Sequence, residues 1–154
     1  MVDCATLPAG DESGGEKMID LPDDRLTDTV AELLARVSAR RFDELAELLT
    51  HDAVFEVPYA GLVVDGREAF CETFAGKVAG MFNPFHFDIV GTYPGRDPDS
   101  LVVEYRSQGT LTATGQPYAN QYVGIFAGKE GRVSLWREYF NPAALTQSAE
   151  GHAQ

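Results

Sequence analysis

The chain has 154 residues, the size of one ordinary domain and too short for two substantial domains joined by a linker. Its composition of 44% apolar, 10% aromatic and 23% charged residues can supply a hydrophobic core, which excludes the collagen-like, mainly disordered and disulfide-scaffold classes. Twelve basic and twenty-four acidic residues give a formal net charge of −12, which repels phosphate backbones and anionic lipid head groups. Neither nucleic acid nor a membrane is therefore expected as a partner.

The two ends of the chain differ in composition from its middle. Residues 1–22 and 146–154 are polar and are predicted to be disordered tails, which leaves 23–145 as a single domain. Cys4 and Cys71 have no metal-ligand spacing, which favours a reduced, cytoplasmic setting. The N-terminal segment lacks the apolar stretch of a signal peptide, and no apolar run approaches the roughly 20 residues of a membrane span.

The first half of the domain reads as mainly helical. Apolar residues recur at helical spacing over residues 26–37, and the period repeats over a short second helix at 42–49, so the two are expected to pack as a hairpin. A first strand is predicted at 53–57 and is ended by Pro58, which cannot donate to a ladder.

A third helix is predicted to begin after Asp65, whose spacing to Glu68 is that of a capping box, and to end near Gly80. Alternating strands separated by turn-rich segments then follow at residues 85–90, 101–114, 118–127 and 132–140. Helices ahead of a hairpin sheet predict an α+β fold, in which the helices cover one face of a curved sheet and leave a hollow.

Each of the last three strands has two faces, and periodicity alone does not decide which of them is buried. Polar faces of antiparallel sheets are commonly solvated. Here, however, Trp136 and Phe140 share a face with Glu138, and Tyr118 and Tyr122 share one with Asn120. Large rings mixed with single polar groups are typical of a small-molecule pocket.

The segments LWREYFNP (135–142), YANQYVGIF (118–126), VEYRSQGTL (103–111) and DGREAF (65–70) carry a family resemblance. Residues 25–145 resemble the SnoaL-like branch of the nuclear transport factor 2-like, or cone-fold, superfamily, and most closely the phenazine-biosynthesis A/B type proteins. The resemblance implies three helices packed on a strongly curved, mostly antiparallel sheet, a central pocket, and a homodimer formed through the sheet. Ketosteroid isomerases, polyketide cyclases, limonene epoxide hydrolases, dehydratases and non-catalytic binders share this fold, which leaves the function open.

The resemblance also implies which side chains work in the pocket. Glu138 is expected to be the catalytic acid or base, Arg106 its oxyanion or carboxylate partner and Gln108 an orienting group. The expected substrate-binding residues are Trp136, Asn120, Tyr122, Tyr118, Glu104, Thr73, Phe74, Phe140, Tyr59 and His86.

Three positions depart from the family patterns. Val57 stands where ketosteroid isomerases carry an Asp before the Pro of the first strand, which excludes a mechanism with that base. Gln108 replaces a carboxylate of the epoxide hydrolases, and an amide orients water but cannot take its proton. Thr73 replaces a His of the phenazine A/B proteins, which argues against their condensation chemistry.

The sequence leaves several interpretations open. An aromatic cavity raises the pKa of Glu138 and a nearby Arg106 lowers it, while a plain Glu138–Arg106 ion pair would have no catalytic role. His86 is either a proton shuttle or a surface residue. No metal and no nucleotide cofactor are expected, because neither ligand spacing nor a phosphate-binding loop occurs. The predicted dimer patch consists of Leu101, Val103, Tyr105, Val133, Leu135 and Tyr139.

The sequence thus predicts a cofactor-independent enzyme of secondary metabolism that cyclises, isomerises or dehydrates a polycyclic or aromatic substrate by proton transfer. Two alternatives remain: a non-catalytic ligand-binding protein with the same pocket, and an epoxide hydrolase with water held by Glu138, Gln108 and Arg106.

Overall fold

The computed structural model describes residues 25–144, so the predicted tails at 1–22 and 146–154 lie outside the described residues. The elements in chain order are α2 (Arg25–Ser38), the 3₁₀ turns η3 (Phe42–Glu44) and η4 (Ala46–Leu48), β1 (Leu49–Val57), the 3₁₀ turn η5 (Pro58–Ala60), β2 (Leu62–Asp65), α3 (Arg67–Thr73), the π-helical segment η6 (Phe74–Val78), α4 (Ala79–Met81), β3 (Phe82–Pro94), β4 (Ser100–Leu111), β5 (Pro117–Lys129) and β6 (Arg132–Phe140).

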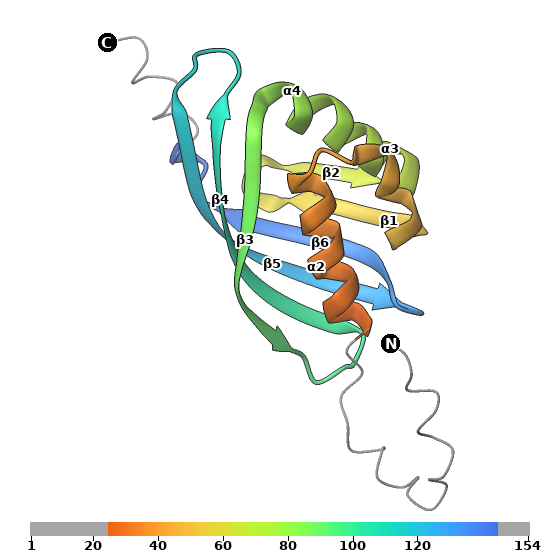
Figure 1. Cartoon of the computed structure of the whole chain (residues 1–154). Coiled ribbons are helices and arrows are strands. Elements are labelled where there is room, and N and C mark those ends of the chain that lie inside the picture. The colour runs from red at the N-terminus through yellow and green to blue at the C-terminus, as the bar shows by residue number, and fades with distance from the viewer. Residues whose placement is uncertain (1–24, 145–154) are drawn as a thin grey trace, which may run out of the picture.

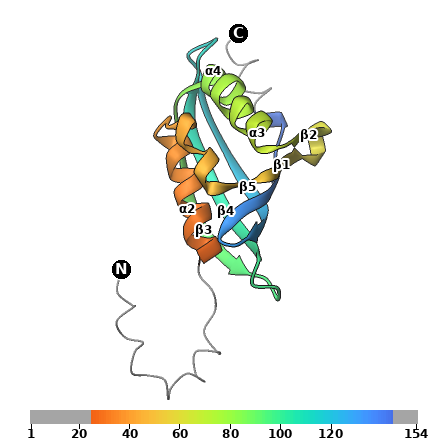
Figure 2. The same cartoon turned by 90° about the vertical axis from the view of Figure 1, so that its right-hand side faces the viewer.

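Within residues 25–144 these strands form one six-stranded sheet in the order β2-β1-β6-β5-β4-β3. Every neighbouring pair is antiparallel except β1 and β6. The sheet is curved, and α2 and the α3–α4 segment lie on one of its faces (Figures 1 and 2). The prediction of an α+β fold with a mostly antiparallel, curved sheet is confirmed.

The helical part differs from the prediction at residues 42–49. This stretch forms two 3₁₀ turns, and Leu49 already begins β1. Its apolar residues Phe42, Leu45 and Leu48 are spaced by three, which suits the three residues per turn of a 3₁₀ helix. The expected hairpin of two α-helices is therefore wrong.

The segment after β1 also differs from the prediction. Residues 58–61 form a turn that ends at Gly61 with φ 67°, and the short strand β2, which the sequence analysis missed, pairs with β1. The N-cap of α3 is Gly66 with φ 104°, and no side chain caps this helix. The predicted capping box of Asp65 and Glu68 does not form, because the strand extends through Asp65 and moves the cap one residue on.

Helix α2 is held to the sheet by an apolar stripe and by a polar network at its C-terminal half. Its buried residues are Leu26, Val30, Leu33, Leu34 and Val37.

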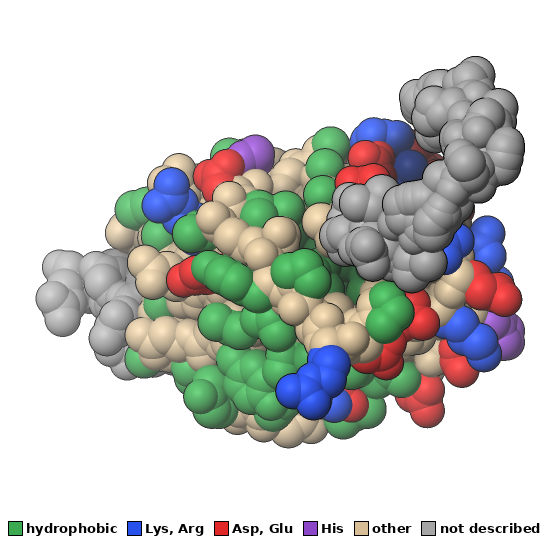
Figure 3. All heavy atoms as spheres, turned by 90° about the horizontal axis from the view of Figure 1, so that it is seen from below, with side chains coloured by type: hydrophobic (Ala, Val, Ile, Leu, Met, Phe, Trp, Pro, Cys, Tyr) green, Lys and Arg blue, Asp and Glu red, His purple; other side chains and the backbone are tan. Residues whose placement is uncertain are grey.

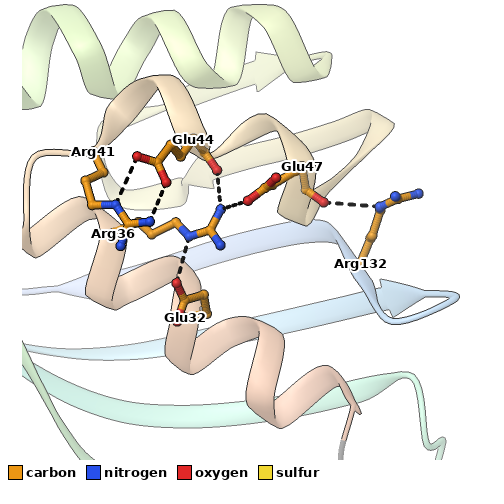
Figure 4. A network of polar contacts seen from close by, with 6 residues as sticks. All are labelled: Glu32, Arg36, Arg41, Glu44, Glu47 and Arg132. Atoms are coloured by element: carbon orange, nitrogen blue, oxygen red, sulfur yellow. Dashed lines mark hydrogen bonds and ion pairs between the residues drawn. The ribbon is translucent and has the colours of Figure 1, made fainter.

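Arg36 is the centre of the polar network (Figure 4). Its Nε donates to Glu32 Oε2 at 2.8 Å, and its Nη1 donates to the Glu44 backbone oxygen at 2.6 Å and to the Glu47 carboxylate. Arg132, at the start of β6, donates to the Glu47 backbone oxygen at 3.2 Å. These bonds connect α2, η3, η4 and β6.

Trp136 on β6 is the centre of the hydrophobic core and is fully buried. Its ring stacks on Phe74 at 5.1 Å and meets the edge of Phe55 at 5.3 Å. Phe74 belongs to the helical layer and Phe55 to β1, so this indole joins the helical segment to the sheet. One side of the aromatic core borders the cavity described below.

The outer surface does not present the predicted dimer patch. Leu101, Val103, Tyr105 and Val133 are buried, because the apolar faces of β4 and of the start of β6 point toward the core. Apolar side chains instead gather over one half of the face seen from below (Figure 3). Homodimer formation stays a prediction. Among residues 25–144, none of the helices combines the length and the hydropathy that a membrane-spanning helix needs.

Candidate active site

A cavity of about 200 Å³ lies between the inner face of the sheet and the helical segment 67–81. Its lining residues are Phe55, Val57, Leu62, Thr73, Phe74, Lys77, Val78, Met81, Phe82, Phe85, Phe87, Tyr118, Tyr122, Glu138 and Phe140. Of these, all within the described range, Glu138 and Lys77 are the two that carry a charge. A larger open cleft of about 650 Å³ beside α3 contains none of the predicted site residues.

Glu138 is a buried carboxyl near the C-terminal end of β6, with 7% of its surface exposed. The loss of hydration raises the pKa of Glu138 to about 7, and a hydrogen bond from Tyr105 opposes part of that rise. The Tyr105 hydroxyl donates to Glu138 Oε2 at 2.5 Å. Near neutral pH the carboxyl is therefore present in both its protonated and its ionised form.

The direction of the Tyr105 hydrogen bond is fixed by Trp136. The indole N–H can only donate, and it donates to the Tyr105 oxygen at 2.9 Å. The hydroxyl proton of Tyr105 therefore points to Glu138. Burial raises the pKa of Tyr105 well above its ordinary value, so this hydroxyl stays a neutral donor. Trp136 and Tyr105 together orient one oxygen of the carboxyl.

Gly124 provides the space for this contact. Tyr105 on β4 is paired with Tyr122 on β5, whereas Glu138 on β6 is paired with Gly124, so the phenol must cross β5 to reach the carboxyl. A Cβ at Gly124 would lie 2.9 Å from Tyr105 Cε1 and 3.1 Å from its hydroxyl oxygen. Gly124 was not among the predicted site residues, although a glycine inside a strand is itself a sign of close approach.

A second buried polar cluster on β4 and β5 reaches the cavity through Tyr118 and Tyr122. The hydroxyls of Ser107 and Tyr122 are hydrogen bonded at 2.8 Å, and either atom can be the donor. Asn120 Nδ2 donates to the Tyr118 hydroxyl at 2.8 Å. Burial raises the pKa of Tyr122 well above its ordinary value, so its hydroxyl is neutral. Ser107 was not among the predicted site residues.

The structure brings together part of the predicted site. Six of the predicted residues line the cavity: Glu138, Tyr122, Tyr118, Thr73, Phe74 and Phe140. Trp136 and Asn120 are buried behind its wall and are hydrogen bonded to the tyrosines at 105 and 118.

The predicted facing of Glu104, Arg106 and Gln108 is wrong. All three are exposed on the outer face, because Tyr105 and Ser107, which alternate with them along β4, point inward. Arg106 therefore forms no ion pair with Glu138, and the predicted water site between Glu138, Gln108 and Arg106 does not exist. This arrangement removes the water site on which the epoxide hydrolase alternative depends.

His86 and Tyr59 also lie outside the cavity. His86 alternates with the inward-facing Phe85 and Phe87, so it is exposed and bonds to Asp88 Oδ1 at 3.0 Å. Tyr59 is 66% exposed in η5, and its ring lies 5.7 Å from that of Tyr139.

The described part of the chain, residues 25–144, holds no group of three or more His, Cys, Asp or Glu side chains that could bind a metal ion.

Known proteins resemble this chain in sequence and in structure. Residues 30–136 match the SnoaL-like domain. An uncharacterised PhzA/B-like protein of Pseudomonas aeruginosa, PA3332, is 27% identical over 112 residues, which are 68% of this chain and 76% of that protein.

Among the solved structures that share the fold are two proteins from Pseudomonas aeruginosa and Mycobacterium tuberculosis. One is a phenazine biosynthesis-related protein of Pseudomonas aeruginosa, with a TM-score of 0.72, 19% identity, and coverage of 82% of this chain and 85% of that chain. The other is an epoxide hydrolase of Mycobacterium tuberculosis, with a TM-score of 0.69, 18% identity, and coverage of 86% and 93%.

Replacement of Glu138 by Gln should change how stability depends on pH. A folded-state pKa of about 7, raised from 4.5, means that the folded protein binds the proton more tightly than the unfolded chain. The contribution of Glu138 is thus fully present below pH 4.5 and is lost as the pH rises to about 7. The free energy of unfolding of the wild type minus that of Glu138→Gln, measured in urea, should fall by about 3 kcal/mol over this range. A constant difference would contradict the buried, protonated carboxyl.

Gly124→Ala should destabilise the protein by about 1–3 kcal/mol, because the new methyl group overlaps Tyr105 and Phe126. Gly76→Ala is the matched control, since a Cβ there meets nothing within 4 Å. Urea unfolding of both variants measures the effect. Equal stability of the two variants would show that the close approach at Gly124 is not needed.

Proposed function

Because the chain belongs to the SnoaL-like domain family, as its motifs predicted, we propose that it is a cofactor-independent enzyme that transfers a proton on a small ring substrate. The observation that carries this proposal is the Glu138 carboxyl, which lines an apolar cavity and has its pKa raised to about 7. A general base is most effective when its pKa lies near the working pH. The names of the two structural relatives, in phenazine biosynthesis and epoxide hydrolysis, support small-molecule chemistry for this fold.

The proposed reaction begins with the ionised form of Glu138. Its carboxylate removes a proton from a carbon next to a carbonyl group, which gives an enolate and the protonated Glu138 carboxyl, and the same carboxyl then returns a proton at another carbon. Tyr105 keeps the carboxylate oriented without itself accepting a proton. Tyr122 donates to the substrate oxygen while Ser107 donates to Tyr122, which the undetermined direction of their bond allows. Isomerisation, dehydration and cyclisation all begin with such a step.

The size of the cavity narrows the class of substrate. Its volume of about 200 Å³ is below the roughly 300–1,000 Å³ of typical ligand pockets. We therefore restrict the predicted polycyclic or aromatic substrates to carbonyl compounds with one or two rings. The aromatic walls formed by Phe55, Phe74 and Phe87 suit a flat ring of this size.

Deuterium exchange tests the proposed proton transfer without knowledge of the natural substrate. The probe is 2-tetralone, a two-ring ketone, incubated with the protein in D₂O at neutral pD, and the loss of its α-proton signals is followed by proton NMR. The wild type should accelerate exchange above the buffer rate, and Glu138→Gln should lower the acceleration at least about 100-fold. Glu68→Gln, at an exposed position of α3 that does not line the cavity, is the control and should keep the wild-type rate.

Ligand binding is measured in parallel by saturation-transfer NMR. Binding of 2-tetralone without accelerated exchange by the wild type would contradict the enzyme proposal and favour the non-catalytic binder. Unchanged exchange by Glu138→Gln would exclude Glu138 as the base.

Tyr105→Phe should shift the pH dependence of the exchange rate. The Tyr105 hydrogen bond lowers the pKa of Glu138, so its removal raises that pKa and moves the acid limb of the profile to higher pH. Tyr93→Phe is the matched control, because Tyr93 is exposed and donates to another glutamate, Glu104, at 3.2 Å. The midpoint of the acid limb should be unchanged in the control. A shift to lower pH in Tyr105→Phe would contradict the account.

A further inference from the structure

The two charged residues of the cavity lie at different depths. Glu138 is buried on the sheet side, whereas Lys77 is exposed and lies in the π-helical segment η6. Within residues 25–144 the Lys77 amine has no hydrogen bond and no ion pair. A cation is thus available at the rim of the cavity, and among the described lining residues the other charged group is Glu138, deep inside.

The helical wall brings Lys77 to the cavity through a regular pattern. Five of its residues line the cavity: Thr73, Phe74, Lys77, Val78 and Met81. Lys77 stands three residues after Phe74 and four before Met81, so its apolar stem follows the same face as these side chains while the amine reaches water. The π-helical turn falls on this face, and such turns occur frequently at functional sites.

The alternative is that Lys77 is a solvated surface lysine without a role in binding. The charge of the whole chain argues for a role in binding. The formal net charge of −12 repels anionic ligands at long range. An anionic substrate therefore needs a local cation, and Lys77 is the one that lines this cavity. An amine that remains partly hydrated binds a carboxylate through a charge-assisted hydrogen bond without the cost of full burial.

We propose that Lys77 is a specificity-determining residue, which binds a carboxylate of the substrate at the cavity rim. The substrate class becomes a one- or two-ring carbonyl compound that bears a carboxylate, and this inference rests on the proposed function of the same cavity. The ring lies between the aromatic walls, the carboxylate contacts Lys77, and the reacting carbon faces Glu138.

A pair of probes that differ in charge tests the proposal. These are 2-naphthoate and the neutral 2-naphthamide, whose dissociation constants are measured by isothermal titration calorimetry at pH 6 and low salt. The wild type should bind 2-naphthoate at least 10-fold more tightly than 2-naphthamide. Lys77→Gln should weaken 2-naphthoate binding about 10-fold and leave 2-naphthamide binding unchanged. Lys129→Gln removes the same charge at an exposed position outside the cavity lining and should change neither constant.

A competition experiment tests whether 2-naphthoate binds in the same cavity as 2-tetralone. An excess of 2-tetralone should displace 2-naphthoate, because both occupy the same cavity. The proposal is overturned if Lys77→Gln keeps the preference for 2-naphthoate, if the wild type shows none, if neither probe binds, or if 2-tetralone does not displace the probe.

The exchange of neutral 2-tetralone separates the two proposals. This reaction is measured with the wild type, and it depends on Glu138 and not on a carboxylate at the rim. If the wild type exchanges 2-tetralone but does not prefer 2-naphthoate, the role of Lys77 is overturned and the proposed reaction is not. Anion recognition without exchange overturns the proposed reaction alone.

Discussion

The hydrogen bond from Tyr105 to Glu138 is the interaction on which the rest of the site depends. A carboxyl removed from water is costly to ionise, and one neutral donor offsets only part of that cost. Glu138 therefore keeps its proton up to about pH 7, far above an exposed glutamate. The hydrogen bond from Tyr105 to Glu138 has two specific requirements. Trp136 orients the Tyr105 hydroxyl, and β5 carries no side chain at Gly124, where the phenol crosses it.

The sheet supplies the rigid part of the site and the helical segment supplies the adjustable part. Glu138, Tyr105 and Tyr122 stand on three adjacent strands whose register fixes their separation. The opposite wall consists of α3, η6 and α4, where the exposed Lys77 and the half-buried Val78 reach the rim. Chemistry placed on strands and recognition placed on a short irregular helix would let relatives share a fold while they differ in substrate.

Much of the fold could be predicted from the residues, since alternation in the late strands and the helical period of residues 26–37 are strong local signals. The face that Glu138 shares with Trp136 and Phe140 indicated a pocket, and the family resemblance implied the role of Glu138 in it. The facing of residues 104–108 was wrong because it depends on cross-strand register, which pairs Tyr105 with Tyr122 and cannot be read from one strand. Gly124 and Lys77 were missed for a related reason. The space that Gly124 leaves for Tyr105 and the cavity rim at Lys77 are each formed by several elements together.

The protonation of Glu138 itself tests the account most directly. Carbon-13 NMR of protein labelled at the glutamate side-chain carboxyls, with the Glu138 signal assigned by its absence in Glu138→Gln, follows this one group through a pH titration. The midpoint of the Glu138 titration should lie near pH 7. A midpoint near 4.5, the ordinary value for glutamate, would show a hydrated carboxyl and contradict the central claim.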